Sequence, residues 1–395
     1  MKNKLKNTGR LKKIGVLVSI LLTSGMLQIA EAGPREQAKR MHDRLVGVPP
    51  TETVLTSMAA KIQSGDTVGA AEEAMSNKLF YNSTLKNFVT PWTNEALTPF
   101  ADLNDYTATV IGMIRDDVPF NQVLTADLVY IGAPGIATAY SQTNNQNYID
   151  LQTKNIDLSD PTNLIPTTQS GLPDSQLTPE AAAGVLTSRA AAAAFLRAGT
   201  NRRAWRFTAI NYLCHDMEDL NDNTRPTDRI RQDVSRSPGG DSKIFLNSCS
   251  GCHSGMDSLT QAFAYYNYDE TAGRLVYTPD QVQAKFLINS SNFPHGYITT
   301  DDHWDNYWRK GPNAVLGWRG DVSGGNGLKS MGTEVANSRA FSQCQVKKVF
   351  KSICFRSPLS VQDQTQVEKI ADTFESDNYN MKRVFADVAV YCMGN

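Results

Sequence analysis

Residues 249–253 hold the arrangement in this chain that is best suited to chemistry, and they read Cys249-Ser250-Gly251-Cys252-His253. The spacing C-x-x-C-H is the attachment signature of c-type haem. Two thiols on one helical turn can add to the two vinyl groups of a porphyrin, and the adjacent histidine then binds the iron. We therefore expect one covalently attached haem c, held through Cys249 and Cys252, with His253 as a ligand of the iron.

Two other uses of paired cysteines fit the sequence less well. A structural zinc ion needs two further ligands, and the sequence contains no second C-x-x-C and no H-x-x-x-H. A thioredoxin-like redox site needs a βαβ unit around the cysteines, and no such pattern surrounds this motif. Haem attachment is therefore the interpretation that the motif favours.

The ligand on the opposite face of the iron would distinguish an electron carrier from a haem enzyme. Our first candidate is Met331, which lies in the predicted loop 327–332, well downstream of the motif. A thioether ligand would raise the reduction potential, although a methionine in such a place can also be an ordinary core residue. His295 and His303 are alternatives that would give bis-histidine ligation and a lower potential. An open or water-occupied position is the third option.

Helical patterns dominate the rest of the chain and must position the motif. Apolar residues recur at i, i+3, i+4 and i+7 within 344–392, which predicts three amphipathic helices. Helical spacing also marks the segments 105–115 and 178–196, and no convincing run of alternating strand residues is present. We expect a mainly α fold, with helical domains, a region around the haem motif that is similar to c-type cytochromes, and long irregular loops.

The sequence divides into four parts. Residues 1–32 are the predicted signal peptide, and residues 33–132 a predicted N-terminal helical domain. Residues 133–177 are rich in Gly, Pro, Thr, Asn and Gln, a composition typical of a polar loop or linker. Residues 178–395 are the predicted haem-binding helical region, with the haem motif at 249–253 and the C-terminal helices at 344–392.

The first 32 residues have the pattern of a secretory signal peptide. Six basic residues lie within residues 1–13, an apolar run follows to Ile29, and the triplet Ala30-Glu31-Ala32 begins and ends on a small residue. We expect cleavage before Gly33. A membrane anchor fits less well, because polar residues interrupt a run that is already short for spanning. The protein should then be periplasmic or extracellular, with no membrane span after cleavage.

The charge of the mature chain bears on its partners. The whole chain has 39 basic and 40 acidic side chains, and removal of six basic residues and of Glu31 leaves a net charge of −6. A mildly acidic protein is a poor match for nucleic acid, whose binding proteins normally carry a basic surplus. We expect a redox protein as the partner, and no nucleic acid.

Four cysteines remain outside the motif, an even number that suits two disulfides in an oxidising compartment. They are Cys214, Cys344, Cys354 and Cys392. Three pairings are possible, and the sequence alone does not choose among them. We favour a bond between Cys354 and Cys392, because it would link two of the C-terminal helices.

The chain resembles a family of exported haem-motif proteins, the planctomycete-type cytochrome c domain proteins with associated domains of unknown function. Short stretches carry the likeness, at residues 44–51, 117–120, 127, 184–189, 213–214, 249–257, 262–263 and 341–356. The resemblance implies an exported cytochrome, often encoded beside a second secreted protein of unknown activity, and it implies no settled substrate. The polar insert at 140–176 departs from the family pattern, and its role is unassigned.

These observations together predict a function. We expect an exported mono-haem c-type cytochrome that transfers single electrons to or from a redox partner, for which a co-encoded secreted protein is one candidate. One alternative is a haem enzyme, peroxidase-like or oxidative, with an open iron site and acid–base help from His295 or His303. The other is an exported partner-binding protein in which the haem is structural. The electron carrier is favoured over the enzyme, and no catalytic residue is assigned.

Overall fold

Three helices close the chain, as the apolar periodicity predicts. The computed structural model describes residues 32–394, and in it these helices are α12 (Arg339–Cys354), α13 (Val361–Ser376) and α14 (Met381–Cys392). The side chains of Ser338, Ser360 and Asn380 cap their N-termini by accepting a hydrogen bond from a backbone N–H of the first turn. Helix α12 packs against both α13 and α14 through buried apolar side chains.

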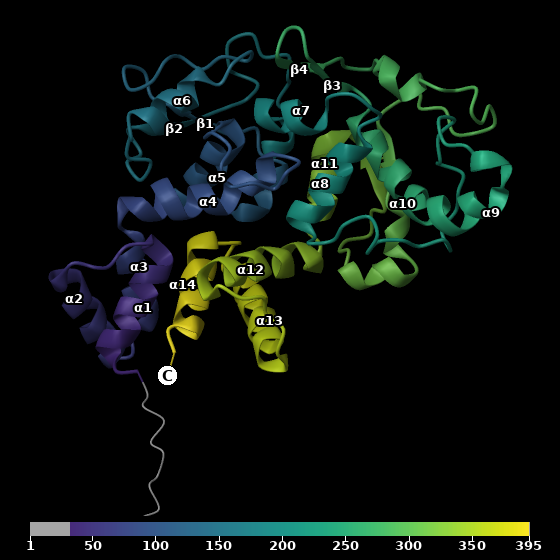
Figure 1. The fold of residues 1–395 in the computed structure, drawn as a ribbon. Helices are drawn as coiled ribbons and strands as arrows, with labels where there is room; N and C mark the ends of the chain where they lie inside the picture. The colour runs from purple at the N-terminus through teal and green to yellow at the C-terminus, as the bar shows by residue number, and fades with distance from the viewer. Residues whose placement is uncertain (1–31, 395) are drawn as a thin grey trace, which may run out of the picture. The chain divides into compact units, whose positions relative to one another are not determined.

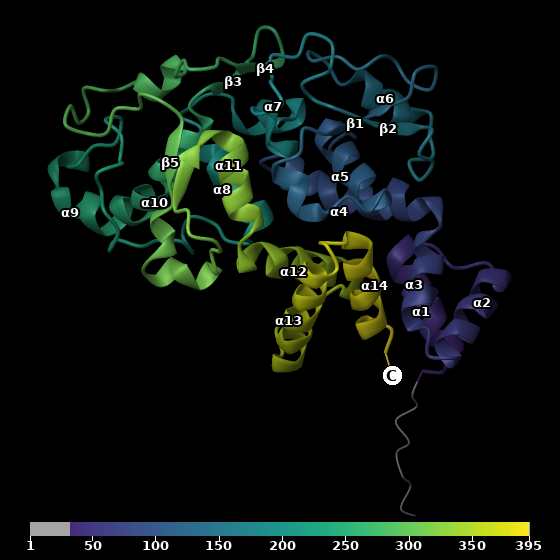
Figure 2. The same ribbon diagram turned by 180° about the vertical axis from the view of Figure 1, so that it is seen from behind.

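The N-terminal helices pack against the end of the chain. They are α1 (Pro34–Val46), α2 (Glu52–Gln63) and α3 (Thr67–Met75). Helices α1 and α3 contact α14, and both views of the ribbon show them side by side (Figures 1 and 2). The residues predicted as an N-terminal helical domain, 33–132, therefore share a core and one compact unit with the C-terminal helices. The predicted signal peptide, 1–32, lies outside the described residues except for Ala32.

One central helix, α5 (Asp105–Arg115), matches the predicted helix 105–115. It is buried along its whole length, and α4 (Lys86–Val89) packs beside it. The strand β1 (Val129–Gly132) also packs against it. A Cβ atom at Gly112 would lie 2.2 Å from the ring of Tyr130, so this close approach of helix and strand requires a glycine.

The segment 133–177 is not a loop or linker throughout, contrary to the sequence prediction. It contains α6 (Gln146–Thr153) and the strand β2 (Leu164–Thr167), which pairs antiparallel with β1. Helix α6 buries Tyr148 and Leu151, which lie three residues apart on one face. The side chain of Asn147 accepts a hydrogen bond from the backbone N–H of Gly132 at 2.8 Å. Asn147, one of the polar residues of the predicted loop, therefore binds a backbone group of a strand instead.

The predicted helix 178–196 begins later than expected. The structure has a 3₁₀ turn, η4 (Gly184–Thr187), followed by α7 (Arg189–Phe195), whose N-terminus Ser188 caps. Gly184 has a φ of +54°, and a Cβ there would lie 2.0 Å from the carbonyl oxygen of Val123 in the turn η3 (Phe120–Leu124). This tight contact with a neighbouring backbone prevents an uninterrupted helix.

The haem motif lies in a helix made of three successive pieces, α9 (Ser242–Ile244), the π-helical turn η6 (Phe245–Cys249) and α10 (Ser250–Thr260). Helix α10 packs against α8 (Arg202–Tyr212) and the short strand β5 (His303–Asp305), which pairs with β6 (Gly324–Asn326). The turn η7 (Gln261–Phe263) and the hairpin of β3 (Tyr266–Asp269) and β4 (Arg274–Tyr277) follow. The remaining helix is α11 (Gly327–Ala336), which leads into α12.

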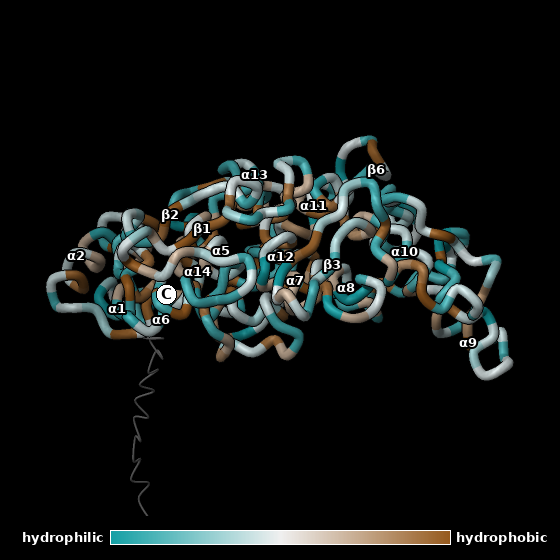
Figure 3. The backbone as a smooth tube through the Cα atoms, turned by 90° about the horizontal axis from the view of Figure 1, so that it is seen from above, coloured by the Kyte–Doolittle hydropathy of each residue, from teal (hydrophilic) through white to brown (hydrophobic). Residues whose placement is uncertain are grey.

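Strands contribute little to the part of the chain that the structure describes. They form three two-stranded antiparallel sheets among many helices, so the mainly α prediction is confirmed. Along the backbone, short hydrophobic stretches alternate with hydrophilic ones (Figure 3). Among residues 32–394, no helix is both long and apolar enough to cross a membrane.

Candidate haem site

The three motif side chains lie on one face of a helix. Cys249 ends η6, and Cys252 and His253 follow in α10, so they occupy positions i, i+3 and i+4. All three are partly exposed, and the side chain of His253 keeps 22% of its accessible surface. The two thiols are free, whereas the other four cysteines form disulfides. The structure thus brings together the side chains that the sequence predicts to hold a haem.

One ring nitrogen of His253 is already committed to a hydrogen bond. Its Nδ1 lies 3.1 Å from Oδ1 of Asp257, one helical turn further along α10. A carboxylate only accepts hydrogen bonds, so Nδ1 carries the proton and donates it. No hydrogen bond to Nε2 is formed by any group within residues 32–394. A histidine that binds a metal typically holds its other N–H in this way, and Nε2 is the nitrogen left for the iron.

The carboxylate of Asp257 is buried and held by Arg202. The guanidinium donates from Nε to Oδ1 at 2.6 Å and from Nη2 to Oδ2 at 2.7 Å. Burial alone would raise the pKa of Asp257, but the charge and hydrogen bonds of Arg202 and the contact with His253 hold it well below the usual value. Arg202 also donates to the carboxylate of Asp233, at 2.6 and 2.9 Å. One guanidinium therefore forms ion pairs with two acids, Asp257 and Asp233.

Two glycines let neighbouring groups approach the motif helix. A Cβ on Gly255 would lie 2.1 Å from Nε1 of Trp308, so the indole packs directly on the helix. A Cβ on Gly251 would lie 1.7 Å from Oδ1 of Asn221. Trp308 belongs to the aromatic segment after His303, and its ring centroid lies 5.8 Å from that of Trp205. Replacement of either glycine would force these neighbours to move.

Two cavities adjoin the helix that carries the motif. One, of about 430 Å³, is lined by Phe245 and Leu246, one turn before Cys249, together with Phe293, His295 and Arg236. The other, of about 260 Å³, is lined by Met256, one turn after Cys252, together with Met217, Arg202 and Arg206. Both cavities combine apolar side chains with arginines, and neither is lined by Cys249, Cys252 or His253.

Met331 lies elsewhere in the fold. The predicted loop 327–332 is instead the first part of α11, because Leu328, Met331 and Val335 are spaced to bury one face of a helix. Met331 is fully buried, and α11 packs against η3 and η7. The turn η7 follows the far end of α10, about 10 Å along the helix axis from His253. Met331 is not among the residues that line either cavity beside the motif.

The two alternative histidines lie in different surroundings. His295 lines the 430 Å³ cavity, and its ring centroid is 5.9 Å from that of Phe293. His303 begins β5, and its Nε2 lies 3.6 Å from Oδ1 of Asp305. Strand β5 contacts α10 through the hydroxyl of Ser258, which donates to the carbonyl of Asp305 at 2.7 Å. Of the three candidate ligands, His295 is the one that lines a cavity together with residues of the motif helix, Phe245 and Leu246.

We did not identify from the sequence the charged residues that hold His253 in place, which are Asp257, Arg202 and Asp233. Asp257 could have been found, because it follows His253 by four residues, the spacing of side chains that meet on a helix. Arg202 and Asp233 could not, because they come from α8 and from a long loop and reach the motif only through the tertiary fold.

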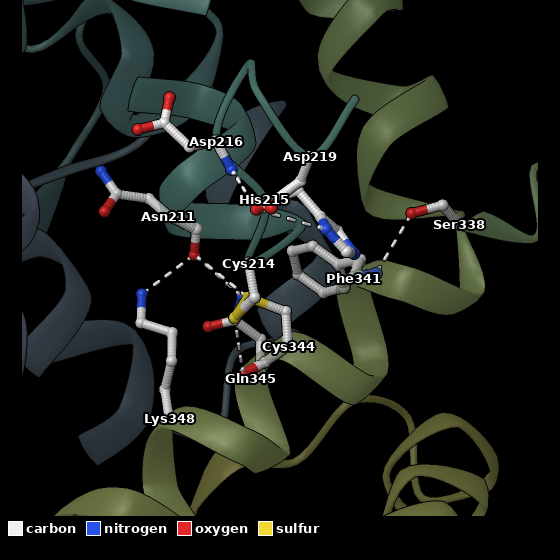
Figure 4. The surroundings of a disulfide bond; sticks show 10 residues. All are labelled: Asn211, Cys214, His215, Asp216, Asp219, Ser338, Phe341, Cys344, Gln345 and Lys348. Carbon is white, nitrogen blue, oxygen red and sulfur yellow. Dashed lines mark hydrogen bonds and ion pairs between the residues drawn. A yellow bond between two sulfur atoms is a disulfide. The ribbon is translucent and has the colours of Figure 1, made fainter. Parts of the chain in front are cut away.

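Both disulfides join distant parts of the chain. Cys214 bonds to Cys344 with a Cα–Cα distance of 5.3 Å, and Figure 4 shows this bond between α12 and the loop after α8. Cys354 bonds to Cys392 with a Cα–Cα distance of 5.6 Å, which is the pairing we favoured. Two disulfides are compatible with an oxidising, exported environment.

Comparisons with known proteins assign no function to this site. No protein family, curated protein or solved structure matches the chain. Within the described residues, no three or more His, Cys, Asp or Glu side chains are gathered to hold a metal ion by themselves. That observation concerns a bare ion, since a haem iron takes only one or two ligands from the protein.

Proposed function

We propose that this protein is an exported mono-haem c-type cytochrome that transfers single electrons. The observation that carries the proposal is the pairing of two free thiols, Cys249 and Cys252, with His253 on one helix face. When bound, a haem supplies the one-electron chemistry of its iron. The protein would supply attachment, the ligands of the iron and the surroundings that set the potential.

The residues fit this group in a specific way. Cys249 and Cys252 would hold the porphyrin, and Nε2 of His253 would bind the iron. Asp257 keeps the proton on Nδ1 and fixes the orientation of the ring, so Nε2 remains a lone-pair donor. Burial raises the pKa of the Cys252 thiol, so it stays protonated at neutral pH, and it donates to the carbonyl of Met217 at 3.4 Å.

The proposal differs from the sequence prediction in the second ligand of the iron. We propose His295 in preference to Met331, because His295 lines a cavity beside the motif helix and Met331 is buried in the core. Two histidine ligands give a lower reduction potential than a histidine and a methionine. The carboxylate of Asp257 acts in the same direction, because it makes the His253 imidazole a stronger donor to iron.

The same carboxylate favours one alternative function. A basic proximal histidine also stabilises oxidised iron, which is useful to a peroxidase-like haem enzyme. In that case His295 would not bind the iron and would instead be available to a substrate as an acid or base. The two functions therefore differ in whether His295 binds the iron.

Absorption spectra of the exported, full-length protein test these proposals. An electron carrier should show low-spin haem in both redox states, with no change on addition of carbon monoxide. His295→Ala should convert it to a form that binds carbon monoxide, whereas Met331→Ala should leave the spectrum unchanged. The reverse result would restore Met331 as ligand. A wild-type protein that is high-spin and binds carbon monoxide would favour the haem enzyme.

The location and the partner are further parts of the proposal. The predicted signal peptide and the two disulfides support a periplasmic or extracellular protein. The resemblance to planctomycete-type cytochrome c domain proteins supports a redox partner that is itself secreted. Loss of export and of haem attachment on deletion of residues 1–32 would support this location, and a haem-loaded cytoplasmic protein would contradict it.

A further inference from the structure

A cavity of about 710 Å³ lies beside the disulfide between Cys214 and Cys344 and includes no residue of the haem motif. Its lining comes from the end of α8, the loop after it, α12, and the start of α13 with the loop before it. A volume of this size is typical of sites for small organic molecules. The disulfide fixes one wall, because it ties the loop after α8 to α12 (Figure 4).

Lysines outnumber acids in the lining of the cavity, whereas the whole chain carries a net charge of −1. Three lysines of α12 line it, Lys347, Lys348 and Lys351, and none forms an ion pair within residues 32–394. Both acids in the lining are paired with arginines, and Arg339, the partner of Glu368, is shared with Asp372 and Glu375. Asp216 receives two hydrogen bonds from Arg206, at 2.6 and 2.5 Å, and Glu368 is paired with Arg339 at 2.7 Å.

One of the three lysines has a structural task. The side-chain nitrogen of Lys348 donates to the backbone carbonyl of Asn211 at 2.9 Å, beside the disulfide (Figure 4), and lies 3.1 Å from the centre of the Trp92 ring. It thereby satisfies one of the carbonyl groups left free at the C-terminus of α8. Burial holds the pKa of Lys348 well below its usual value. Lys347 and Lys351 are exposed, and their ammonium groups remain available to a bound anion.

Apolar side chains complete the lining. They are Leu97, Ile210, Pro358, Leu359 and Val367. Leu359, on the rim of the cavity, is 82% exposed. A bound molecule with an apolar part would cover it and gain free energy in proportion to the area removed from water.

We propose that this cavity binds a small carboxylic acid with an apolar body. Its carboxylate would pair with Lys347 and Lys351, and its apolar part would lie against Leu359 and Ile210. The free charges favour an anion, and the five apolar side chains favour a molecule whose larger part is hydrocarbon. This site is independent of haem attachment and would add a ligand-binding function to the proposed electron carrier.

Calorimetric titration of the full-length exported protein with decanoate, well below micelle formation, tests the proposal. Decanol and decylamine have the same apolar chain with a neutral or a positive head, so they isolate the contribution of charge. Decanoate should bind saturably and at least tenfold more tightly than either. The double variant Lys347→Gln/Lys351→Gln should weaken decanoate binding at least tenfold, and Lys310→Gln, an exposed lysine outside the cavity, should not.

The apolar half of the site needs its own variant. Leu359→Ser should weaken decanoate binding severalfold, and thermal unfolding should show that both cavity variants remain folded. The proposal is wrong if decanoate shows no saturable binding, if decanol binds equally well, or if the double lysine variant binds like the wild type. None of these outcomes depends on whether a haem is attached, so they leave the electron-carrier proposal to its own test.

Discussion

Arg202→Gln should destabilise the protein strongly, even without an attached haem. The guanidinium forms four hydrogen bonds with Asp257 and Asp233, at distances between 2.6 and 2.9 Å. Asp257 is fully buried and the side chain of Asp233 is only 10% exposed, so both charges would lose their main compensation. Removal of one partner from a buried ion pair typically costs about 3–5 kcal/mol, and we expect a loss in this range.

Urea unfolding at neutral pH measures this loss, and the chain offers a matched control. The next residue, Arg203, pairs with Glu95 at 2.8 Å on the surface, where the side chains are 38% and 50% exposed. Exposed pairs contribute only about 0.2–1 kcal/mol, so Arg203→Gln should change stability little. The two substitutions make the same chemical change at adjacent positions. They differ in that Arg202→Gln leaves two buried carboxylates without their partner, whereas Arg203→Gln leaves the exposed carboxylate of Glu95.

A second substitution tests the reason for the loss. Asp257→Asn added to Arg202→Gln removes the buried charge that the first change left unpaired, so the double variant should be more stable than Arg202→Gln alone. The reasoning is refuted if Arg202→Gln costs no more than Arg203→Gln. It is also refuted if the second substitution lowers stability further by its full single-variant cost.

Three other perturbations have definite expected results. Gly255→Ala should cost about 1–3 kcal/mol in urea unfolding, because the new methyl group would lie 2.1 Å from the indole of Trp308, and an unchanged midpoint would contradict that packing. Replacement of Cys214 and Cys344 by serine should cost about 5 kcal/mol, since this disulfide closes a loop with a sequence separation of 130, and a loss below about 1 kcal/mol would argue that the bond is absent. Burial lowers the pKa of Lys285 to about 7, so the unfolded chain binds this proton up to a higher pH than the folded chain does. Stability should therefore rise between pH 7 and pH 10, and Lys285→Met should remove about 1–3 kcal/mol of that rise, as pH-dependent thermal unfolding would measure.

The sequence predicts best those elements whose own side chains determine them. Helix α5 has the predicted bounds, and α12, α13 and α14 follow the apolar periodicity within 344–392. Their buried positions recur every three or four residues, and Ser338, Ser360 and Asn380 mark their starts. Local signals of this kind survive in the folded chain because packing and capping act in the same direction.

The sequence predicts poorly where distant backbone contacts decide the structure. The predicted helix 178–196 is interrupted because the backbone at Gly184 contacts Val123, about sixty residues earlier in the chain. Strand β2 forms because β1 is available to pair with it, and Asn147 binds β1 from α6. None of these contacts leaves a pattern inside the segment itself, so composition alone indicated a loop.

The candidate site shows the same division. Cys249, Cys252 and His253 were identified from their spacing, and a single helix brings them to one face. Asp257, which orients the histidine, is a neighbour on the same helix. Arg202, the cation that keeps Asp257 charged, comes from α8. Met331 is buried in the core, a role that the sequence does not distinguish from that of a haem ligand, because methionine suits both.

The mass of the mature polypeptide tests the central claim most directly. The full chain, expressed with residues 1–32 in a host that attaches haem c to exported proteins, should lose its signal peptide and gain the mass of one haem. Cys249→Ser/Cys252→Ser should abolish the gain, and Cys354→Ser/Cys392→Ser, which removes a disulfide instead, should not. A processed polypeptide without added mass, from a host that loads another c-type cytochrome in parallel, would contradict the account.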